Sequence, residues 1–233
     1  MAKRDMSGII FDTSYARKLL ANQPSSESES IQSTIDILKM QPHIEGGYFV
    51  ETDREQRMVP NPFKDLPPLS NATDKVDTSE TRHASTSINY LLTPKSPVGY
   101  FHRNRGHTVH TLHKGRAIYV IMYVDQPRDE NGRVRVNSFL VGQDLVNGED
   151  LQWAVPGGKF KATFLYPDED EGQESKNGML ISETVIPGFE YADHDFLTAE
   201  DFVQYLDQEQ QEQLQWLLRP DQQARLEEVR KGK

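Results

Sequence analysis

Short runs of apolar or alternating residues recur through the middle of the chain, between residues 85 and 186. Turn-forming pairs such as Asn131-Gly132 and Pro187-Gly188 separate these runs. Many short strands at this spacing favour an all-β sandwich or barrel. The predicted strands are Ser85–Leu92, Val98–Arg103, Thr108–Leu112, Ala117–Val124, Val134–Val141, Gln152–Val155, Phe160–Tyr166 and Met179–Ile186.

The N-terminal side of this region has a different pattern. Residues 1–29 end in a Ser/Glu-rich stretch without periodicity, which predicts a loose tail. Ser30 can cap a helix whose apolar residues follow at helical spacing and which Pro42 would end. Residues 45–52 then predict a turn and a strand, and the polar, Pro-rich residues 55–84 predict a long surface loop.

The C-terminal side is helical again. Thr198 and Asp201 resemble a capping arrangement, and leucines follow at helical spacing. We find no internal repeat and no second globular domain in the sequence. We therefore expect a flexible tail over residues 1–29, one β domain over residues 30–200 and a helical extension over residues 201–233.

The composition and net charge of the chain limit the classes of binding partner that we expect. The chain has 233 residues, a formal net charge of −10 and no cysteine. An acidic surface repels phosphate backbones and anionic lipid, so neither nucleic acid nor a membrane is an expected partner. Lack of cysteine excludes thiolate sites and fits a reducing compartment. Because the N-terminus has no signal-peptide core and no apolar run reaches membrane-spanning length, we expect a cytoplasmic or nuclear protein.

Two segments match the spacing of the cupin motifs. A metal-binding cupin carries His-x-His and then Glu in its first motif, and Pro-x-Gly followed by His in its second. The four ligand positions here hold His102, Asn104, Thr108 and Lys161. Further segments carry the same likeness: Glu45–Thr52, Ser85–Pro94, Gln152–Gly158, Ile186–Phe189 and Asp193-His194.

On these residues, the chain resembles the RmlC-like cupin family of unknown function, cupin type five, which occurs in bacteria and fungi. The resemblance covers about residues 31–200 and implies an all-β double-stranded β-helix, or jelly-roll barrel, with short N- and C-terminal helices. It also implies a homodimer. The further likeness to sugar-nucleotide epimerases is one of fold and does not transfer activity.

The changed ligand positions predict no metal and no other cofactor. One imidazole, two weak donors and a cation make a poor site for a first-row metal, and a protonated Lys161 would repel a divalent ion. One route to a metal stays open. Strand alternation places His110 on the same face as Thr108, so His102 and His110 with water could form a site.

Strand alternation also outlines a pocket that needs no metal. His102 or His110 would move a proton, with Tyr90 or Tyr100 as the partner acid. Lys161 would stabilise negative charge or hold a phosphate or carboxylate. The other ligand-binding candidates are Glu51, Asn104, Thr108, Trp153, Lys159 and Phe189.

Each candidate also has a structural interpretation. Polar groups inside a barrel can satisfy one another, and Glu51 suits a salt bridge with an arginine somewhat better than a catalytic role. Trp153 and Phe189 suit the core or a pocket wall. Asp193-His194 is interpreted as a loop anchor, because adjacent residues on a strand point to opposite sides.

Three hypotheses follow. The first is a metal-independent isomerase or epimerase that acts on a polar or anionic, sugar-like small molecule. The second is a binding module with the same pocket, and the third is a structural homodimer with a vestigial pocket. A carboxylate paired with a pocket histidine would favour the enzyme, and Glu51 and Glu183 are its only plausible suppliers.

Overall fold

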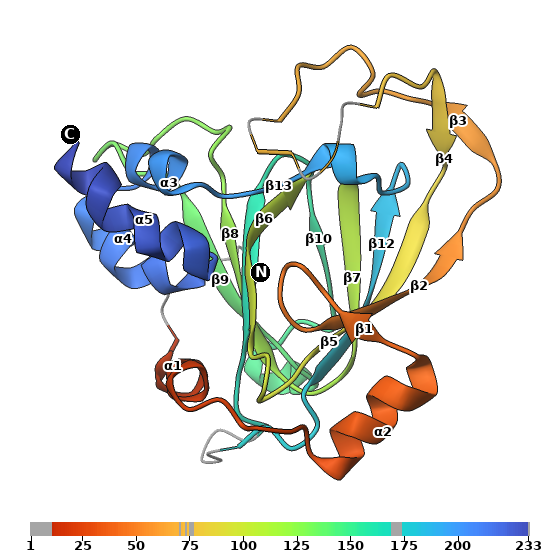
Figure 1. The fold of residues 1–233 in the computed structure, drawn as a ribbon, viewed down its shortest axis with the longest axis vertical. Coiled ribbons are helices and arrows are strands. Elements are labelled where there is room, and N and C mark those ends of the chain that lie inside the picture. Colours follow the sequence, from red (N-terminus) through yellow and green to blue (C-terminus); the bar gives the residue numbers. More distant parts are fainter. Residues whose placement is uncertain (1–10, 70, 73, 75–76, 169–173, 233) are drawn as a thin grey trace.

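Two antiparallel sheets face each other and form the body of the molecule (Figure 1). The computed structural model describes residues 11–232 apart from residues 70, 73, 75–76 and 169–173. The six-stranded sheet has the order β1-β2-β5-β12-β7-β10, and the five-stranded sheet has the order β13-β6-β11-β8-β9. The all-β cupin prediction is confirmed by this architecture.

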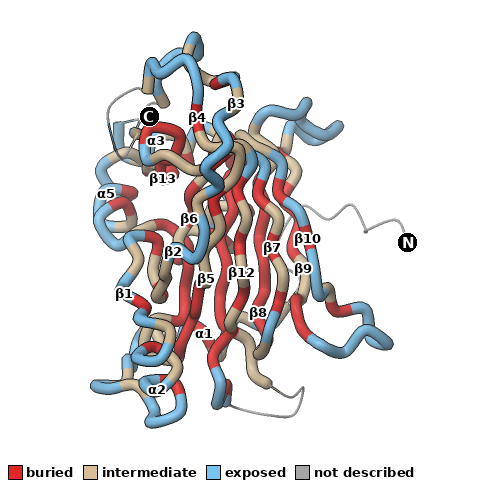
Figure 2. The backbone as a smooth tube through the Cα atoms, turned by 90° about the vertical axis from the view of Figure 1, so that its right-hand side faces the viewer, coloured by how far each residue is buried: buried red, intermediate tan, exposed pale blue. Residues whose placement is uncertain are grey.

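The six-stranded sheet consists of β1 (Gln41–Pro42), β2 (Tyr48–Arg54), β5 (Thr86–Leu92), β12 (Met179–Ile186), β7 (His107–Lys114) and β10 (Gln152–Val155). Figure 2 shows the buried middle of this sheet as red strands side by side. In β12, buried residues alternate with half-buried ones along most of the strand. This alternation is expected for a strand that turns one face to the barrel interior.

The five-stranded sheet consists of β13 (His194–Phe196), β6 (Val98–Asn104), β11 (Phe160–Leu165), β8 (Ala117–Met122) and β9 (Val136–Val141). Every residue of β8 and β11 is buried. Both faces of these strands are covered, so their sequences are almost continuously apolar.

The C-terminal helices pack against the five-stranded sheet and share a hydrophobic core with β6, β8 and β11. They are α3 (Ala199–Tyr205), α4 (Gln208–Leu214) and α5 (Pro220–Lys231). Thr198 caps α3 by accepting a hydrogen bond from the backbone N–H of Asp201, as the sequence predicts. Trp216 meets Phe164 of β11 edge to face, with ring centroids 5.0 Å apart.

Residues 11–29 are more ordered than predicted, and residues 1–10 of the predicted tail lie outside the described residues. Residues 14–21 form helix α1 (Ser14–Ala21), whose Ala16 is buried in the same core as the C-terminal helices. Helix α2 (Glu29–Leu38) begins earlier than predicted, because Ser28 rather than Ser30 accepts the capping hydrogen bond from Ile31. Helix α1 is too short for its apolar residues to show a helical period, and tertiary packing stabilises it.

The predicted loop 55–84 contains a small two-stranded sheet, β3 (Met58–Pro60) and β4 (Thr81–His83). Single 3₁₀ turns lie at Leu145–Asn147, Tyr191–Asp193 and Gln215–Leu217. Over the described part of the chain, no helix is both long and apolar enough to cross a membrane.

Candidate functional site

A small pocket opens between β2, β5, β12 and the segment after β12. Its volume is about 100 Å³. The lining residues are His43, Glu45, Phe49, Glu51, Arg54, Thr86, Ile88, Asn104, Glu183, Val185, Phe189, Glu190 and Tyr191. A larger groove of about 680 Å³ lies near the opposite end of β7, but its buried charges, Arg116 and Glu149, pair with each other. The chemistry therefore concentrates in the smaller pocket.

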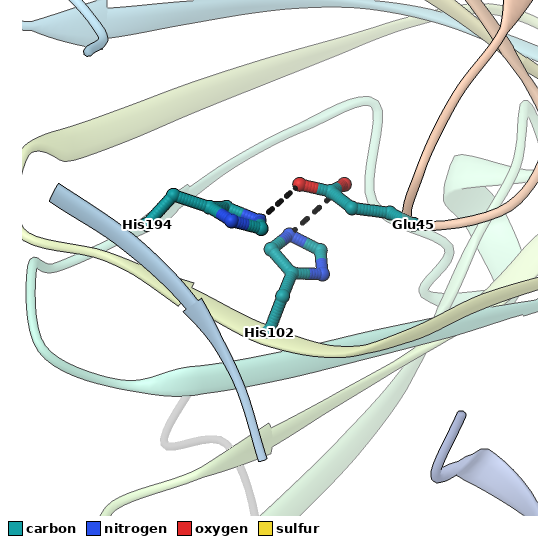
Figure 3. A group of neighbouring side chains, drawn as sticks. All are labelled: Glu45, His102 and His194. Carbon is teal, nitrogen blue, oxygen red and sulfur yellow. Dashed lines mark hydrogen bonds and ion pairs between the residues drawn. The ribbon is translucent and has the colours of Figure 1, made fainter. Parts of the chain in front are cut away.

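Glu45, which lines this pocket, meets the buried side chains of His102 and His194 (Figure 3). The Nε2 of His194 lies 2.8 Å from Oε1 of Glu45, and the Nε2 of His102 lies 3.2 Å from Oε2. All three residues are buried, and their ligand atoms lie within 4.8 Å of one another.

The loop before β2 delivers Glu45 to this position. Gly46 has a φ of 100°, and a Cβ at this position would lie 2.0 Å from the carbonyl oxygen of Val98. The loop can therefore lie against β6 only because this residue is glycine. The carbonyl of Glu45 accepts a hydrogen bond of 2.7 Å from the backbone N–H of Tyr100.

The protonation pattern of the cluster follows from burial and neighbours. Burial lowers the pKa of His102 to about 3, so its imidazole is neutral at pH 7. Burial alone would raise the pKa of Glu45, but the imidazoles around it outweigh this effect and hold that pKa well below its usual value. Burial would lower the pKa of His43, but Glu45, whose Oε2 lies 3.5 Å from its Nδ1, raises it above the usual value.

A second buried cluster joins Lys161, Glu183 and His110. The Nζ of Lys161 lies 2.9 Å from Oε2 of Glu183 and 2.9 Å from Nε2 of His110. The same Glu183 oxygen lies 3.2 Å from Nε2 of His110. Burial would raise the pKa of Glu183, but the charge of Lys161 dominates and lowers it well below the usual value. Glu183, which lines the pocket, is thus the carboxylate paired with His110, and it is one of the two suppliers that the sequence offers.

Lys161 of this second cluster holds one of the four motif positions at which other cupins carry metal ligands. Lys161, on β11, is directly opposite His102 on β6. Its ammonium group is held beside Glu183, and His110 faces that cation. These residues do not fit a divalent ion at the four motif positions, because the ammonium group would repel it.

Several predicted site residues do reach the pocket. Glu51, Asn104 and Phe189 line it. Glu51 also forms a salt bridge with Arg54 at 2.8 Å, which is the structural role that the sequence favoured. Other predicted residues are buried but do not line the pocket, among them His102, Thr108, His110 and Lys161.

Other predicted residues have structural roles. Tyr90 donates its hydroxyl to the carbonyl of Gly46. Trp153 is in the core, stacked on His110 with ring centroids 5.2 Å apart. Lys159 does not share the interior with Lys161 but pairs with the half-exposed carboxylate of Asp125.

Tyr100 requires a correction, because it does not share the interior face with His102. The register between β6 and β11 shifts between Lys161, which pairs with His102, and Thr163, which pairs with Gly99. This bulge inserts one extra residue into β6 and breaks the alternation on which the prediction depended. Tyr100 instead packs against the core under the C-terminal helices.

Sequence reasoning did not place His43, Glu45 or His194 among the site residues. The local signal for Glu45 was the Gly46-Gly47 pair that follows it. The sequence interpretation treated Asp193 and His194 together as a loop anchor, because adjacent strand residues point to opposite sides. This interpretation is correct for Asp193 but not for His194. Asp193 pairs with Arg82, whereas His194 points inward to Glu45.

Comparison with known proteins agrees with this fold. The model of a cupin superfamily family, DUF985, matches residues 32–197. Uncharacterized protein YML079W of Saccharomyces cerevisiae is 42% identical over 197 residues, which cover 84% of this chain and 88% of the yeast protein. A solved hypothetical protein from Leishmania major is 28% identical, with a TM-score of 0.57 over 86% of this chain and 98% of its own.

A solved protein from Shewanella oneidensis, 23% identical, has a TM-score of 0.58 over 84% of this chain and 99% of its own, and this likeness supports the fold alone. The family model covers most of the chain, and the yeast relative matches along nearly all of its length. The chain therefore belongs to the DUF985 family of the cupin superfamily.

Proposed function

We propose that this cupin binds a small, neutral, hydroxyl-bearing molecule in the interior pocket and catalyses proton transfer on it, as an isomerase or epimerase does. The observation that supports this proposal most strongly is the hydrogen bonding of the Glu183 carboxylate. Its Oε2 is held by Lys161 and His110, whereas its Oε1 accepts no hydrogen bond from the described residues. Glu183 lines the pocket, so it offers a bound molecule an ionised acceptor.

A second acceptor at the pocket also favours a ligand that supplies hydrogen-bond donors. Oδ1 of Asn104 is buried and has no donor among the described residues. Buried acceptors without donors are costly, so a hydroxylated ligand would gain from supplying them. Phe49 and Phe189 provide apolar walls against which the carbon skeleton can pack.

Charge argues against an anionic ligand. The ammonium group of Lys161 is already neutralised by Glu183, and Glu45 adds a second carboxylate to the pocket. A phosphate or carboxylate would meet these two anions, and Arg54, which also lines the pocket, is already paired with Glu51 and Glu190. The anionic alternative that the sequence suggested is therefore the weaker one.

Size limits the ligand further. A volume of about 100 Å³ is well below the roughly 300–1,000 Å³ of common ligand pockets. The bound part must be small, such as a short sugar, a hydroxyketone or one end of a longer molecule.

The reaction that we propose needs no oxidant. A proton on the hydroxyl-bearing carbon next to a carbonyl passes to Oε1 of Glu183 and leaves an enediolate. The hydroxyl proton moves to the former carbonyl oxygen, and Glu183 returns its proton to the former carbonyl carbon, so the carbonyl and the hydroxyl have exchanged places with no net change in protons. The charge of Lys161 stays beside the carboxylate during this exchange. A binding module with the same pocket but no such transfer is the alternative.

Binding is tested by thermal melting with a panel of short neutral sugars and hydroxyketones, amino sugars and sugar phosphates. We expect a neutral compound to raise the melting temperature of the wild type and to lose this effect in Glu183→Gln. Glu149→Gln is the matched control, because Glu149 is also a buried carboxylate paired with a cation but lies away from the pocket. Stabilisation by phosphorylated compounds alone, or equal stabilisation of Glu183→Gln, would contradict the proposal.

Catalysis is tested separately from binding. The stabilising compound is incubated in D₂O, and NMR follows deuterium entry at the carbon next to its carbonyl. Exchange that needs Glu183 supports the isomerase, whereas binding without exchange leaves the binding module.

A further inference from the structure

We propose that Glu45, His102 and His194 bind one divalent transition-metal ion. Their ligand atoms already lie within 4.8 Å of one another, and all three residues are buried. This site differs from the four motif positions of metal-binding cupins and shares only His102 with them. The inference does not depend on the proposed isomerase chemistry, although both use the same pocket.

The orientation of His102 is the first independent support. Its Nδ1 lies 2.8 Å from the carbonyl oxygen of Tyr100, and a carbonyl can only accept a hydrogen bond. The Nδ1 of the neutral ring therefore carries the proton, and Nε2 has a lone pair. That Nε2 is buried, forms no hydrogen bond in the described structure and lies 3.2 Å from Oε2 of Glu45.

Two acceptors that face each other at this distance repel unless a cation lies between them. A hydrogen bond from the distal ring nitrogen to a backbone carbonyl is also how metal-binding histidines are commonly oriented. The imidazole of His102 is therefore oriented in the way that a metal-binding imidazole is.

The distances fit a single ion. Zinc and related ions bind imidazole nitrogen and carboxylate oxygen at about 2.0–2.2 Å, so adjacent ligands lie about 3.0–3.4 Å apart. The Glu45 oxygens lie 3.2 Å from His102 Nε2 and 2.8 Å from His194 Nε2. Both separations are close to this range, and the two imidazoles have ligand atoms within 4.8 Å of each other.

Three separate parts of the fold hold the ligands in place. Glu45 is fixed by the loop that Gly46 allows against β6. His102 lies on β6, and His194 lies on β13, where it pairs with Asn104 of β6. Figure 3 shows both imidazoles directed at the same carboxylate.

The donor set indicates the kind of ion. Two imidazoles and one carboxylate suit Zn²⁺, Fe²⁺ or Co²⁺, and three protein ligands leave positions open for water or substrate. Because Glu45 also lines the pocket, a bound molecule could reach the ion. The pair His102 and His110 is a weaker site, since the ammonium group of Lys161 lies 2.9 Å from Nε2 of His110.

The test uses the full chain, purified without a histidine tag and freed of metal by dialysis against a chelator. Co²⁺ is titrated while visible absorption is recorded, and Zn²⁺ is then added as a competitor. We expect absorption bands that saturate at one Co²⁺ per chain and disappear with Zn²⁺. His102→Gln and Glu45→Gln should each weaken binding at least tenfold, whereas the exposed-site control His113→Gln should not.

X-ray absorption of the Co²⁺-loaded wild type provides a readout that needs no variant, and two imidazole ligands are expected. Circular dichroism checks that each variant is folded, and His194→Gln replaces any variant that is not. Absence of saturable bands, binding unaffected by these substitutions, or binding lost in His110→Gln instead would overturn the proposal. Glu183→Gln should retain Co²⁺, so this result separates the metal site from the proposed proton transfer.

Discussion

At the scale of single residues, the barrel interior contains two carboxylates with different surroundings. Glu45 lies among imidazoles, whereas Glu183 is paired with an ammonium group. Both are buried, and both have a lowered pKa. Each carboxylate therefore stays charged inside the protein only because particular partners remain in place.

Replacing Lys161 tests the ion pair with Glu183. Lys161→Met keeps most of the volume but leaves a buried carboxylate without its cation, so we expect a loss of about 3–5 kcal/mol in the free energy of unfolding. The double variant Lys161→Met/Glu183→Gln removes both charges and should recover most of that loss. Chemical denaturation of the four proteins measures the coupling. Near-normal stability of Lys161→Met would mean that the pair contributes little.

The buried His110 should make stability depend on pH. Burial and the charge of Lys161 lower its pKa, while Glu183 opposes them, and Tyr119 also contacts the ring. The unfolded chain binds a proton near the ordinary pKa of 6.5 and the folded chain does not, so stability is full above that pH and falls below it. The contribution is about 1.4 kcal/mol per pH unit for one proton.

Denaturation between pH 7 and pH 5 measures this effect. His110→Gln should show a shallower decline than the wild type, and the exposed control His113→Gln should not. Equal slopes for His110→Gln and the wild type would contradict the assignment.

At the scale of elements, the loop before β2 and the bulge in β6 position the site. The bulge separates Tyr100 from His102, and the loop places Glu45 beside that histidine. Neither feature follows from strand alternation. Both arise where backbone from distant parts of the sequence meets at close range.

Gly46→Ala tests the loop. A Cβ here would meet the Val98 carbonyl at 2.0 Å, and the φ of 100° is unfavourable for alanine. We expect a loss well above the ~1–3 kcal/mol that an unfavourable backbone conformation costs alone. Gly132→Ala is the matched control, since Gly132 has a φ of 76° but nothing within 4 Å of the added atom. Similar losses of unfolding free energy for both variants would show that the close approach does not matter.

At the scale of the whole molecule, helices cover the five-stranded sheet, but one edge of the six-stranded sheet is largely open. The edge strand β1 pairs with β2 only at Tyr48 and Phe49. The remainder of β2, from Val50 to Arg54, has no neighbour on that side among the named strands. An open edge favours pairing with a second chain.

We predict a homodimer that covers this edge, in agreement with the resemblance noted in the sequence. Sedimentation velocity at micromolar concentration should give the mass of two chains. Hydrogen exchange should be slow at the amides of Val50–Arg54 that do not bond to β5. A monomer, or fast exchange at these amides in a dimer, would contradict this arrangement.

The sequence alone predicted the eight central strands, the cupin motif spacing and the replacement of motif ligands by Asn104, Thr108 and Lys161. These features are local, because alternation and turn chemistry depend on residues a few positions apart. It also identified Glu183 as a possible histidine partner, but it could not decide between Glu183 and Glu51. That choice depends on register, which pairs Glu183 with His110 across β12 and β7.

Only the tertiary structure brought Glu45, His102 and His194 together. These residues come from a loop, β6 and β13, and as many as 149 positions separate Glu45 from His194. Their meeting depends on sheet order, on one bulge and on one close backbone approach at Gly46. Such contacts arise from how the chain closes in space, and no periodicity along the sequence encodes them.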